Sequence, residues 1–215
     1  MKLYKFRKLE NCQDLERIES IVKNGFYCND FFSFNDMNEG VYPHDENLEE
    51  RIASDFFQAK KKYKICSFST EEAMKSELMW GHYANAGKGV VIEVDVDEKY
   101  QSKVYPVKYL PSREILTNFS DAKVVLTTKS RSWSYKKESR FLSNDNLENN
   151  TVKLGTISKI YFGIPFKSWT NYDDILKENK PLKKYLCYKE KLESYLASQN
   201  INFEDFDFKQ FNGEM

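Results

Sequence analysis

One carboxylate in the second half of the chain has neighbours that suit acid–base or electrostatic chemistry. Glu138 precedes Arg140 by two residues and follows Trp133 and Tyr135. A carboxylate in such company can act as a general acid or base, or stabilise a cationic transition state. The alternative is a surface glutamate paired with Arg140 or Lys136, and exposed pairs of this kind contribute little stability. Spacing alone leaves both interpretations open.

Two serines and an arginine are candidates for holding a polar ligand. Ser67 and Ser69 bracket Phe68 in an extended segment, so their hydroxyls share one face of a strand. Ser69 is equally suited to start a helix, because Glu72 three residues later completes a capping box. Arg7 ends an early strand, where a guanidinium can hold a phosphate through two parallel hydrogen bonds. A solvated strand end is the alternative for Arg7.

Three ring-bearing side chains gather at the end of a predicted helix. Trp80, His82 and Tyr83 fall within four residues of one another, and Gly87 stands where that helix should end. The rings of Trp80 and Tyr83 can stack on a nucleotide base or pack in a core. His82 lies four residues after Leu78 on an apolar stripe, so a core histidine is its alternative. We treat the three as a candidate ligand wall.

The cysteine and histidine content argues against a metal site. The chain has four cysteines and two histidines, with no C-x-x-C pair. We therefore expect no zinc site, no metal cofactor and no disulfide scaffold, but reduced thiols. Cys28 and Cys66 fall in predicted strands and are expected to be buried and inert.

Charge and hydropathy limit the classes of partner and the cellular locations that we expect for this protein. Lys plus Arg and Asp plus Glu both number 33, so no overall field attracts a nucleic-acid backbone. The first residues lack the apolar core of a signal peptide, and no apolar run approaches the ~20 residues that span a bilayer. We expect a cytoplasmic protein with no membrane partner.

The elements that must position these residues alternate irregularly along the chain. Period-two and helical spacings predict nine strands and five helices. The strands cover residues 3–7, 26–28, 63–68, 89–96, 104–109, the segment after 137, 151–154, 157–162 and 202–208; the helices cover 12–23, 48–61, the stretch from Ser69 to 84, 113–129 and 183–198. On the strand over 89–96, Glu93 and Asp95 alternate with valine and isoleucine, which predicts that both face solvent.

The order of these elements predicts an α+β fold. A chain of 215 residues with 16 Phe, 14 Tyr and 3 Trp can bury a sizeable core. We assign residues 1–165 to a core domain. Residues 166–215 are assigned to a C-terminal helical extension, with a possible final strand, that packs on this core.

Taken together, the motifs resemble a family of uncharacterised bacterial and phage domains. Members share a Leu-Tyr-Lys-Tyr/Phe-Arg strand, a Phe-Asn-Asp loop, a Phe-Ser strand end, Trp-x-His-Tyr-Ala, Gly-Val-x-Ile-Glu, Trp-x-Tyr-Glu-x-Glu-x-Arg and Ile-x-x-Ile-x-Phe-Gly. The matching segments are residues 3–7, 34–36, 67–69, 80–84, 89–93, 133–140 and 157–163. The chain departs from the pattern at Lys136, where the family has its first glutamate.

The same order also resembles, more remotely, the ADP-ribosyltransferase fold of the Arg-Ser-Glu class. This resemblance implies a pair of small mixed or antiparallel sheets with flanking helices. It also implies that Arg7 holds the phosphates of NAD and that Ser67 and Ser69 support the nicotinamide ribose. Glu138 would then stabilise the oxocarbenium ion as the catalytic residue. Trp80, His82 and Tyr83 would complete the cofactor site.

Two classes of function remain as hypotheses. The first is an NAD-consuming enzyme, either an ADP-ribosyltransferase or an NAD glycohydrolase, acting on a protein or nucleic-acid target, for example as an effector in phage–host conflict. The second is a non-catalytic module of the same fold that binds a nucleotide or a protein. Lys136 favours the second and argues against arginine modification, whereas Arg7, the two serines and Glu138 favour the first.

Overall fold

The fold is built on a seven-stranded, mainly antiparallel sheet. The computed structural model describes residues 1–34, 50–111, 121–166 and 171–206. The strand order is β11-β10-β4-β1-β3-β8-β5, and only β10 and β11 run parallel. These strands are β1 (Lys2–Lys8), β3 (Lys64–Ser69), β4 (Gly89–Val96), β5 (Val104–Pro106), β8 (Glu138–Ser143), β10 (Gly155–Phe162) and β11 (Asn202–Asp205). The expectation of an α+β fold is thereby confirmed.

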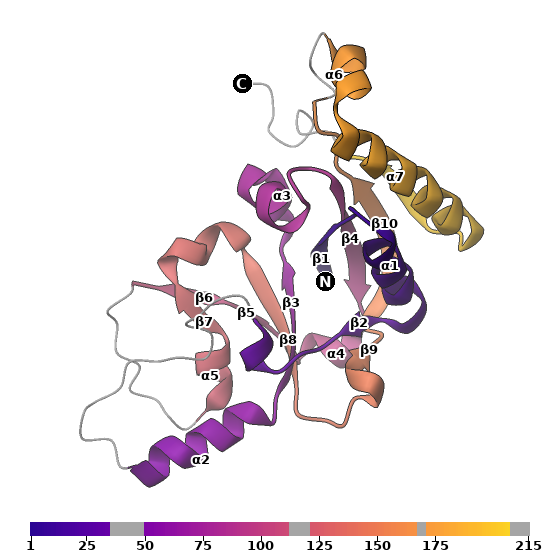
Figure 1. Ribbon diagram of the computed structural model, residues 1–215. Helices are drawn as coiled ribbons and strands as arrows, with labels where there is room; N and C mark the ends of the chain where they lie inside the picture. The colour runs from indigo at the N-terminus through magenta and orange to yellow at the C-terminus, as the bar shows by residue number, and fades with distance from the viewer. Residues whose placement is uncertain (35–49, 112–120, 167–170, 207–215) are drawn as a thin grey trace.

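Two small sheets and several helices surround the main sheet (Figure 1). The small sheets pair β2 (Phe26–Tyr27) with β9 (Thr151–Val152), and β6 (Lys108–Leu110) with β7 (Thr128–Ser130). The α-helices are α1 (Cys12–Asn24), α2 (Glu50–Lys61), α3 (Glu77–Tyr83), α4 (Glu98–Gln101), α5 (Ala122–Leu126), α6 (Tyr172–Glu178) and α7 (Lys180–Ser198). Short 3₁₀ helices are η1 (Phe31–Ser33), η2 (Glu71–Lys75), η3 (Arg131–Lys136) and η4 (Glu148–Asn150).

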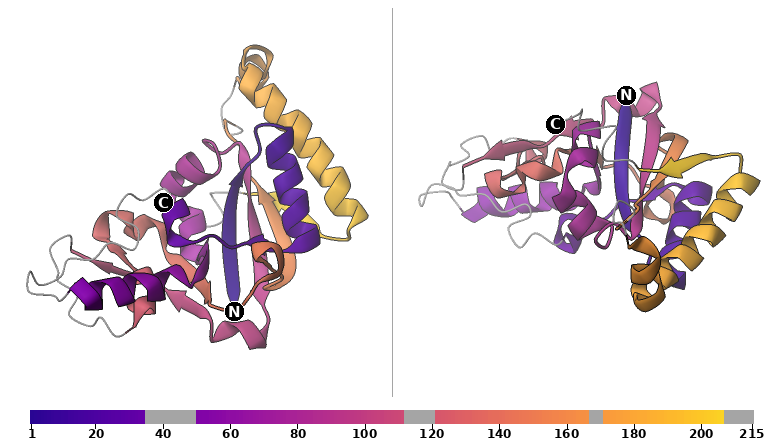
Figure 2. Two further views of the ribbon diagram at one scale, coloured as in Figure 1. Left: turned by 60° about the horizontal axis from the view of Figure 1, so that its bottom comes forward. Right: turned by 90° about the horizontal axis from the view of Figure 1, so that it is seen from above.

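Helices α1 and α7 lie side by side and cover one face of the β1–β4–β10 part of the sheet (Figures 1 and 2). Asn11 is the N-cap residue of helix α1, and its side-chain oxygen accepts a hydrogen bond from the Asp14 N–H at 3.0 Å. Its apolar stripe, which includes Ile18, packs with Ile92 of β4 and Leu192 of α7 in one buried cluster. The helix thus forms because an N-cap residue stabilises its first turn and its apolar face is buried in the core.

A second layer covers the opposite face of β4. Val91 packs there with Phe6 of β1, Trp80 of α3 and Phe206 of the C-terminal segment. Because both faces are covered, the prediction that Glu93 faces solvent is wrong. Its side chain is buried and accepts hydrogen bonds from Lys2 Nζ at 2.6 Å, Ser158 Oγ at 2.7 Å and Tyr161 OH at 3.0 Å. Asp95 is partly exposed.

The helix expected from Ser69 to residue 84 is two shorter elements. Ser69 is the last residue of β3, Thr70 precedes η2, and Ser76 separates η2 from α3. Because Thr70, and not Ser69, is the N-cap residue of η2, Ser69 does not start the helix in the predicted capping box with Glu72.

Two other expectations fall partly outside the described residues. These are the Phe-Asn-Asp loop, beyond Phe34, and most of the first half of the helix predicted over 113–129. In the described part of that helix, α5 ends at Leu126 and residues 128–130 are strand β7.

Strands β1 and β3 join the two halves of the sheet through a single register pair, Tyr4 with Ser69. By contrast, β1 pairs with β4 along its whole length, from Lys2 to Lys8. The two expected small sheets are therefore fused into one sheet that opens between β1 and β3. The segment after residue 165 supplies α6, α7 and β11, and β11 extends this same sheet. Within the described ranges, no helix has the length and apolar character that a membrane crossing requires.

Candidate functional site

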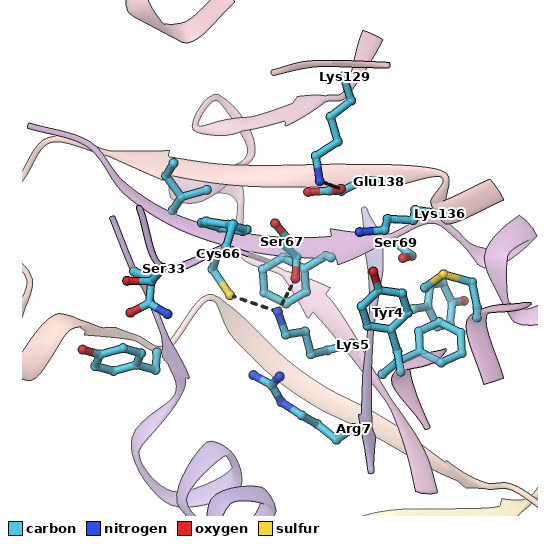
Figure 3. Close-up of a pocket in the computed structure, with 18 residues that line it drawn as sticks. Tyr4, Lys5, Arg7, Ser33, Cys66, Ser67, Ser69, Lys129, Lys136 and Glu138 are labelled. Atoms are coloured by element: carbon cyan, nitrogen blue, oxygen red, sulfur yellow. Dashed lines mark hydrogen bonds and ion pairs between the residues drawn. The ribbon is translucent and has the colours of Figure 1, made fainter. Parts of the chain in front are cut away.

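The divergence of β1 from β3 opens a cavity of about 290 Å³ (Figure 3). Residues 4–7 of β1 form one wall and residues 65–69 of β3 form the other. The remaining lining comes from neighbouring elements: Tyr27, Asn29, Ser33, Phe34, Met79, Tyr83, Lys129, Lys136 and Glu138. Since the space lies in a gap within the sheet, side chains from both faces of β3 reach it.

Two cations project from β1 toward this space. Lys5 and Arg7 are two residues apart, so they share one face of the strand. The Lys5 ammonium donates to the Ser67 carbonyl and lies 3.8 Å from Cys66 Sγ, so it bridges the gap between the strands. Burial lowers the pKa of Lys5 and of Arg7. Among the described residues, neither forms an ion pair with an acidic side chain.

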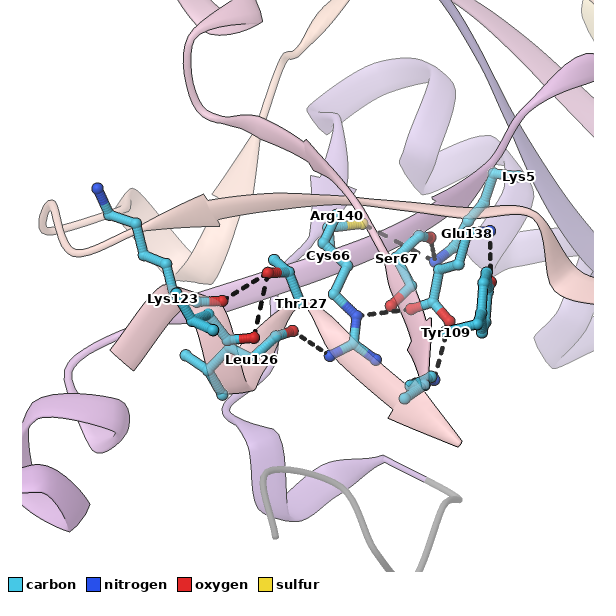
Figure 4. Close-up of polar contacts among 11 residues, drawn as sticks. Lys5, Cys66, Ser67, Tyr109, Lys123, Leu126, Thr127, Glu138 and Arg140 are labelled. Carbon is cyan, nitrogen blue, oxygen red and sulfur yellow. Dashed lines mark hydrogen bonds and ion pairs between the residues drawn. The ribbon is translucent and has the colours of Figure 1, made fainter. Parts of the chain in front are cut away.

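Glu138 is the only carboxylate among the described residues that line the cavity, and it is held by two cations, Lys129 (Figure 3) and Arg140 (Figure 4). Lys129 Nζ donates to one carboxylate oxygen at 2.8 Å, and Arg140 Nε donates to the other at 2.7 Å. The backbone N–H of Glu138 donates to Tyr109 OH at 2.8 Å. Arg140, which is fully buried, also donates to the Leu126 carbonyl. Glu138 therefore pairs with Arg140, as the alternative interpretation held, but the pair is buried rather than at the surface, since Glu138 is 5% exposed.

This environment fixes the protonation state of Glu138. Burial alone would raise its pKa, but the charges of Arg140 and Lys129 outweigh burial and lower the pKa to about 2. The side chain therefore stays ionised at neutral pH. It can stabilise positive charge or accept a hydrogen bond, but it cannot serve as a proton donor there.

Strand register places the two serines beside this carboxylate. Ser69 lies opposite Glu138 of β8 and opposite Tyr4 of β1, and Ser67 lies opposite Arg140. Residues directly opposite in antiparallel strands point to the same face, so Ser67, Ser69 and Glu138 share one face. All three line the cavity.

Tyr83 and Lys136 form another edge of the cavity. The Lys136 ammonium lies 4.0 Å from the ring centroid of Trp133 and 4.8 Å from that of Tyr83. Lys136 is only 6% exposed and lines the cavity, so its side chain is built into the wall. These contacts keep a cation and an aromatic ring together at the cavity edge.

The other two members of the expected ligand wall do not line the cavity. Trp80 is buried in the second layer, where its ring contacts Phe6 and Phe206 and its Nε1 donates to the Met74 carbonyl at 2.9 Å. It fills the core because helix α3 turns this ring toward β1. His82 is exposed and contacts Tyr135 OH through Nδ1 at 3.2 Å.

Several cavity residues were not predicted from the sequence, among them Lys5, Cys66 and Lys129. Strand alternation was a usable signal for Lys5, since it occupies the same face as Arg7. Lys129 has no local signal, because its pairing with Glu138 depends on how β7 packs beside β8. Cys66 is buried, as expected, yet it borders the cavity.

Comparisons with known proteins add no assignment. No protein-family model matches the chain, and neither a curated protein sequence nor a solved structure matches it significantly. Within the described ranges, no group of three or more His, Cys, Asp or Glu side chains is placed to hold a metal ion.

Proposed function

We propose that the cavity binds NAD or a closely related nucleotide and cleaves the bond between nicotinamide and ribose. The protein would then act as an ADP-ribosyltransferase or an NAD glycohydrolase. The observation that carries this proposal is convergence: Arg7, Ser67, Ser69, Tyr83 and Glu138 come from four separate segments and line one cavity.

The charge of the lining suits a phosphate-bearing ligand. Lys5, Arg7, Lys129 and Lys136 face the space with Glu138, which gives four cations and one carboxylate. Lys5 and Arg7 have no acidic partner among the described residues. A phosphate would supply the missing negative charge through charge-assisted hydrogen bonds. The volume of about 290 Å³ is at the lower end for small-molecule sites, so a dinucleotide would extend beyond this space.

Glu138 supplies the chemical argument. When the glycosidic bond breaks, nicotinamide leaves with the bonding electron pair and the ribose becomes cationic. A carboxylate that stays ionised at neutral pH stabilises this developing charge. Water or a nucleophile of a target then adds to the ribose carbon and completes the reaction.

A second candidate function is nucleotide binding without catalysis. Its support is the pair of hydrogen bonds from Lys129 and Arg140, which occupy both carboxylate oxygens of Glu138. Two adjacent cations reduce the negative potential that the carboxylate offers to a cationic transition state. The same fold would then recognise a nucleotide and present it to a partner.

A single set of measurements separates the two candidates. The purified chain is incubated with labelled NAD, with and without cell lysate, and free nicotinamide and labelled products are quantified. We expect nicotinamide release, and we expect Glu138→Gln to lower its rate about a hundredfold or more. Glu148→Gln, an exposed carboxylate outside the cavity, is the matched control and should leave the rate unchanged.

Binding is measured on the same variants by calorimetry. Arg7→Ala should chiefly weaken NAD binding, because it removes a phosphate contact. Binding without nicotinamide release would reject the enzyme and support the second candidate. Absence of both binding and release would reject both. Nicotinamide release that survives in folded Glu138→Gln would reject the role assigned to this glutamate.

A further inference from the structure

Two cysteines face each other across a strand pair at the cavity wall. Asn29, just after β2, forms an isolated antiparallel bridge with Ile65 of β3. Both backbone hydrogen bonds of this bridge are present, at 2.9 Å from Asn29 N–H and 2.6 Å from Ile65 N–H. One residue further along each segment, the opposed residues are Cys28 and Cys66. This pairing joins positions that are 38 residues apart (66 − 28).

The backbone directions confirm how the two cysteines are opposed. The Cys28 N–H points away from β3 and donates to the Asn150 carbonyl at 2.7 Å, while Cys66 pairs with Phe141 on its other side. Cys28 and Cys66 therefore occupy a non-hydrogen-bonded position, where Cα atoms lie about 4.5 Å apart. A disulfide bridges Cα separations of about 4.4–6.8 Å. Both side chains belong to one buried cluster.

The two thiols have different surroundings. Cys66 Sγ borders the cavity and lies 3.8 Å from Lys5 Nζ (Figure 3), whereas Cys28 is fully buried and its thiol contacts the Phe26 carbonyl at 3.8 Å. Among the described residues, Cys28, Lys5 and Arg7 are the titratable or charged groups that act most on Cys66. Together they lower its pKa, and the pKa of Cys28 is raised by its interaction with Cys66 and by burial.

We infer that Cys28 and Cys66 form a redox-modification site that a small hydroperoxide reaches through the cavity. The Cys66 sulfur attacks one peroxide oxygen, the O–O bond breaks, and hydroxide leaves. Sulfur is oxidised by two electrons to the sulfenic acid while the peroxide is reduced. The Cys28 thiol then attacks that sulfur, the S–S bond forms, and the S–O bond breaks. Hydroxide leaves again and takes the Cys28 proton as water.

The chemistry explains which cysteine reacts first. Thiolates, not thiols, are the nucleophiles, and reactive thiolates lie beside cations with access to a reagent. Cys66 meets both conditions and Cys28 meets neither. The resulting disulfide would tie the segment after β2 to β3, and it would convert the thiol that contacts Lys5 into an uncharged disulfide sulfur. This inference does not depend on the proposed NAD chemistry.

The test treats the reduced full-length chain with hydrogen peroxide under native conditions. Remaining thiols are alkylated after denaturation, and the digested protein is examined by mass spectrometry. We expect a peptide pair linked through Cys28 and Cys66 that dithiothreitol separates. Cys12 and Cys187, both exposed, report the accessibility of ordinary thiols in the same sample. Oxidation of these two while Cys28 and Cys66 stay reduced would overturn the inference.

Two variants test the individual roles. Cys28→Ala removes the resolving thiol, so dimedone should instead trap a sulfenic acid on Cys66. Lys5→Met removes the neighbouring ammonium and should raise the pH midpoint of Cys66 oxidation by about one unit. Dimedone labelling that favours Cys12 or Cys187 over Cys66 would overturn the site. An unchanged pH midpoint in Lys5→Met would overturn the role of Lys5.

Discussion

At the scale of single residues, the site is dominated by charge held away from water. Glu138 meets Lys129 and Arg140 in a cluster where all three side chains are almost fully buried. Burying an ion costs several kcal/mol, and attraction offsets this cost only when hydrogen bonds are well made. Both carboxylate oxygens have such bonds, at 2.8 and 2.7 Å. Removing the carboxylate would therefore break both ion pairs of the cluster at once.

The first residue-scale prediction concerns the stability of Glu138→Gln. At pH 7 it should lower the free energy of unfolding by about 3–5 kcal/mol, because two buried cations lose their ion pairs with this carboxylate. The folded-state pKa of Glu138, about 2, lies below its unfolded value of about 4.5. Its contribution is thus fully present above about pH 4.5 and is lost as pH falls toward 2. Urea unfolding at pH 7 and pH 3 should show the difference between wild type and variant shrinking in acid. A difference independent of pH would contradict the ion cluster.

The second residue-scale prediction concerns Lys5→Met. Methionine keeps the length of the side chain but removes a half-buried ammonium that has no acidic partner among the described residues. At pH 7 we expect a gain of about 1 kcal/mol in unfolding free energy, together with weaker binding of a phosphate-bearing ligand. Because burial lowers the Lys5 pKa, wild type recovers stability as pH rises from the folded toward the unfolded pKa, so the gain should shrink there.

Thermal unfolding and calorimetric titration with ADP-ribose measure the two effects of Lys5→Met. Lys8→Met, an exposed lysine near the end of the same strand, is the matched control and should change stability by less than about 0.5 kcal/mol. A marked loss of stability in Lys5→Met would show that the ammonium is a structural group.

At the scale of elements, local sequence patterns predict strands and helices, which depend on neighbouring residues. They do not predict which faces are buried, because that depends on segments far apart in the chain. The alternation over 89–96 predicts strand β4 correctly. It does not reveal the second layer, because that layer comes from Trp80, Tyr161 and Phe206, which lie far apart in the chain. The alternation therefore predicts that Glu93 faces solvent, whereas its side chain is buried among hydrogen-bond donors.

The candidate site follows the same division. Arg7, Ser67, Ser69 and Glu138 stand at strand ends or on strand faces, which spacing can reveal. The opening between β1 and β3 is a matter of register between strands that are about sixty residues apart, and no local pattern encodes it. The ion cluster around Glu138 and the opposition of the two buried cysteines depend on the same long-range pairing.

The element-scale prediction compares a glycine that follows a helix with a glycine inside a helix. Gly25 follows α1 with φ of 95°, and a Cβ there would lie 2.3 Å from the Val152 carbonyl oxygen. Gly25→Ala should therefore cost about 2–3 kcal/mol, because backbone atoms of β9 would have to move. Gly81 lies inside α3 with nothing within 4 Å of a Cβ, so Gly81→Ala should stabilise by about 0.5–1 kcal/mol. Chemical denaturation of both variants checks the contrast, and equal effects would show that the α1–β2 connection is not constrained as described.

At the scale of the whole molecule, the segment after residue 165 contains the expected helix and final strand and packs on the rest of the chain. Strand β11 pairs with β10 in register, and α7 packs against α1. Leu182, Tyr185, Leu192 and Leu196 of α7 are each at most 1% exposed within the main core cluster. Because α7, together with α1, covers one face of the β1–β4–β10 part of the sheet, its apolar side chains belong to the main hydrophobic core.

The last prediction follows from this arrangement. A chain ending at residue 165 lacks α7 and β11, so it would expose the apolar face that β4 and β10 present to α7. Burial of that face supplies much of the hydrophobic free energy that favours folding. The net free energy of unfolding of a domain is only about 5–15 kcal/mol, so losing this burial is expected to prevent folding. We therefore expect the 1–165 fragment to bind a hydrophobic dye such as ANS and to show no cooperative thermal transition by circular dichroism. A chain ending at residue 206 keeps every described element and is the matched control, which should unfold cooperatively. A 1–165 fragment that unfolds cooperatively near the temperature of this control would show that the first 165 residues are an independent domain, with α7 and β11 as a dispensable cover.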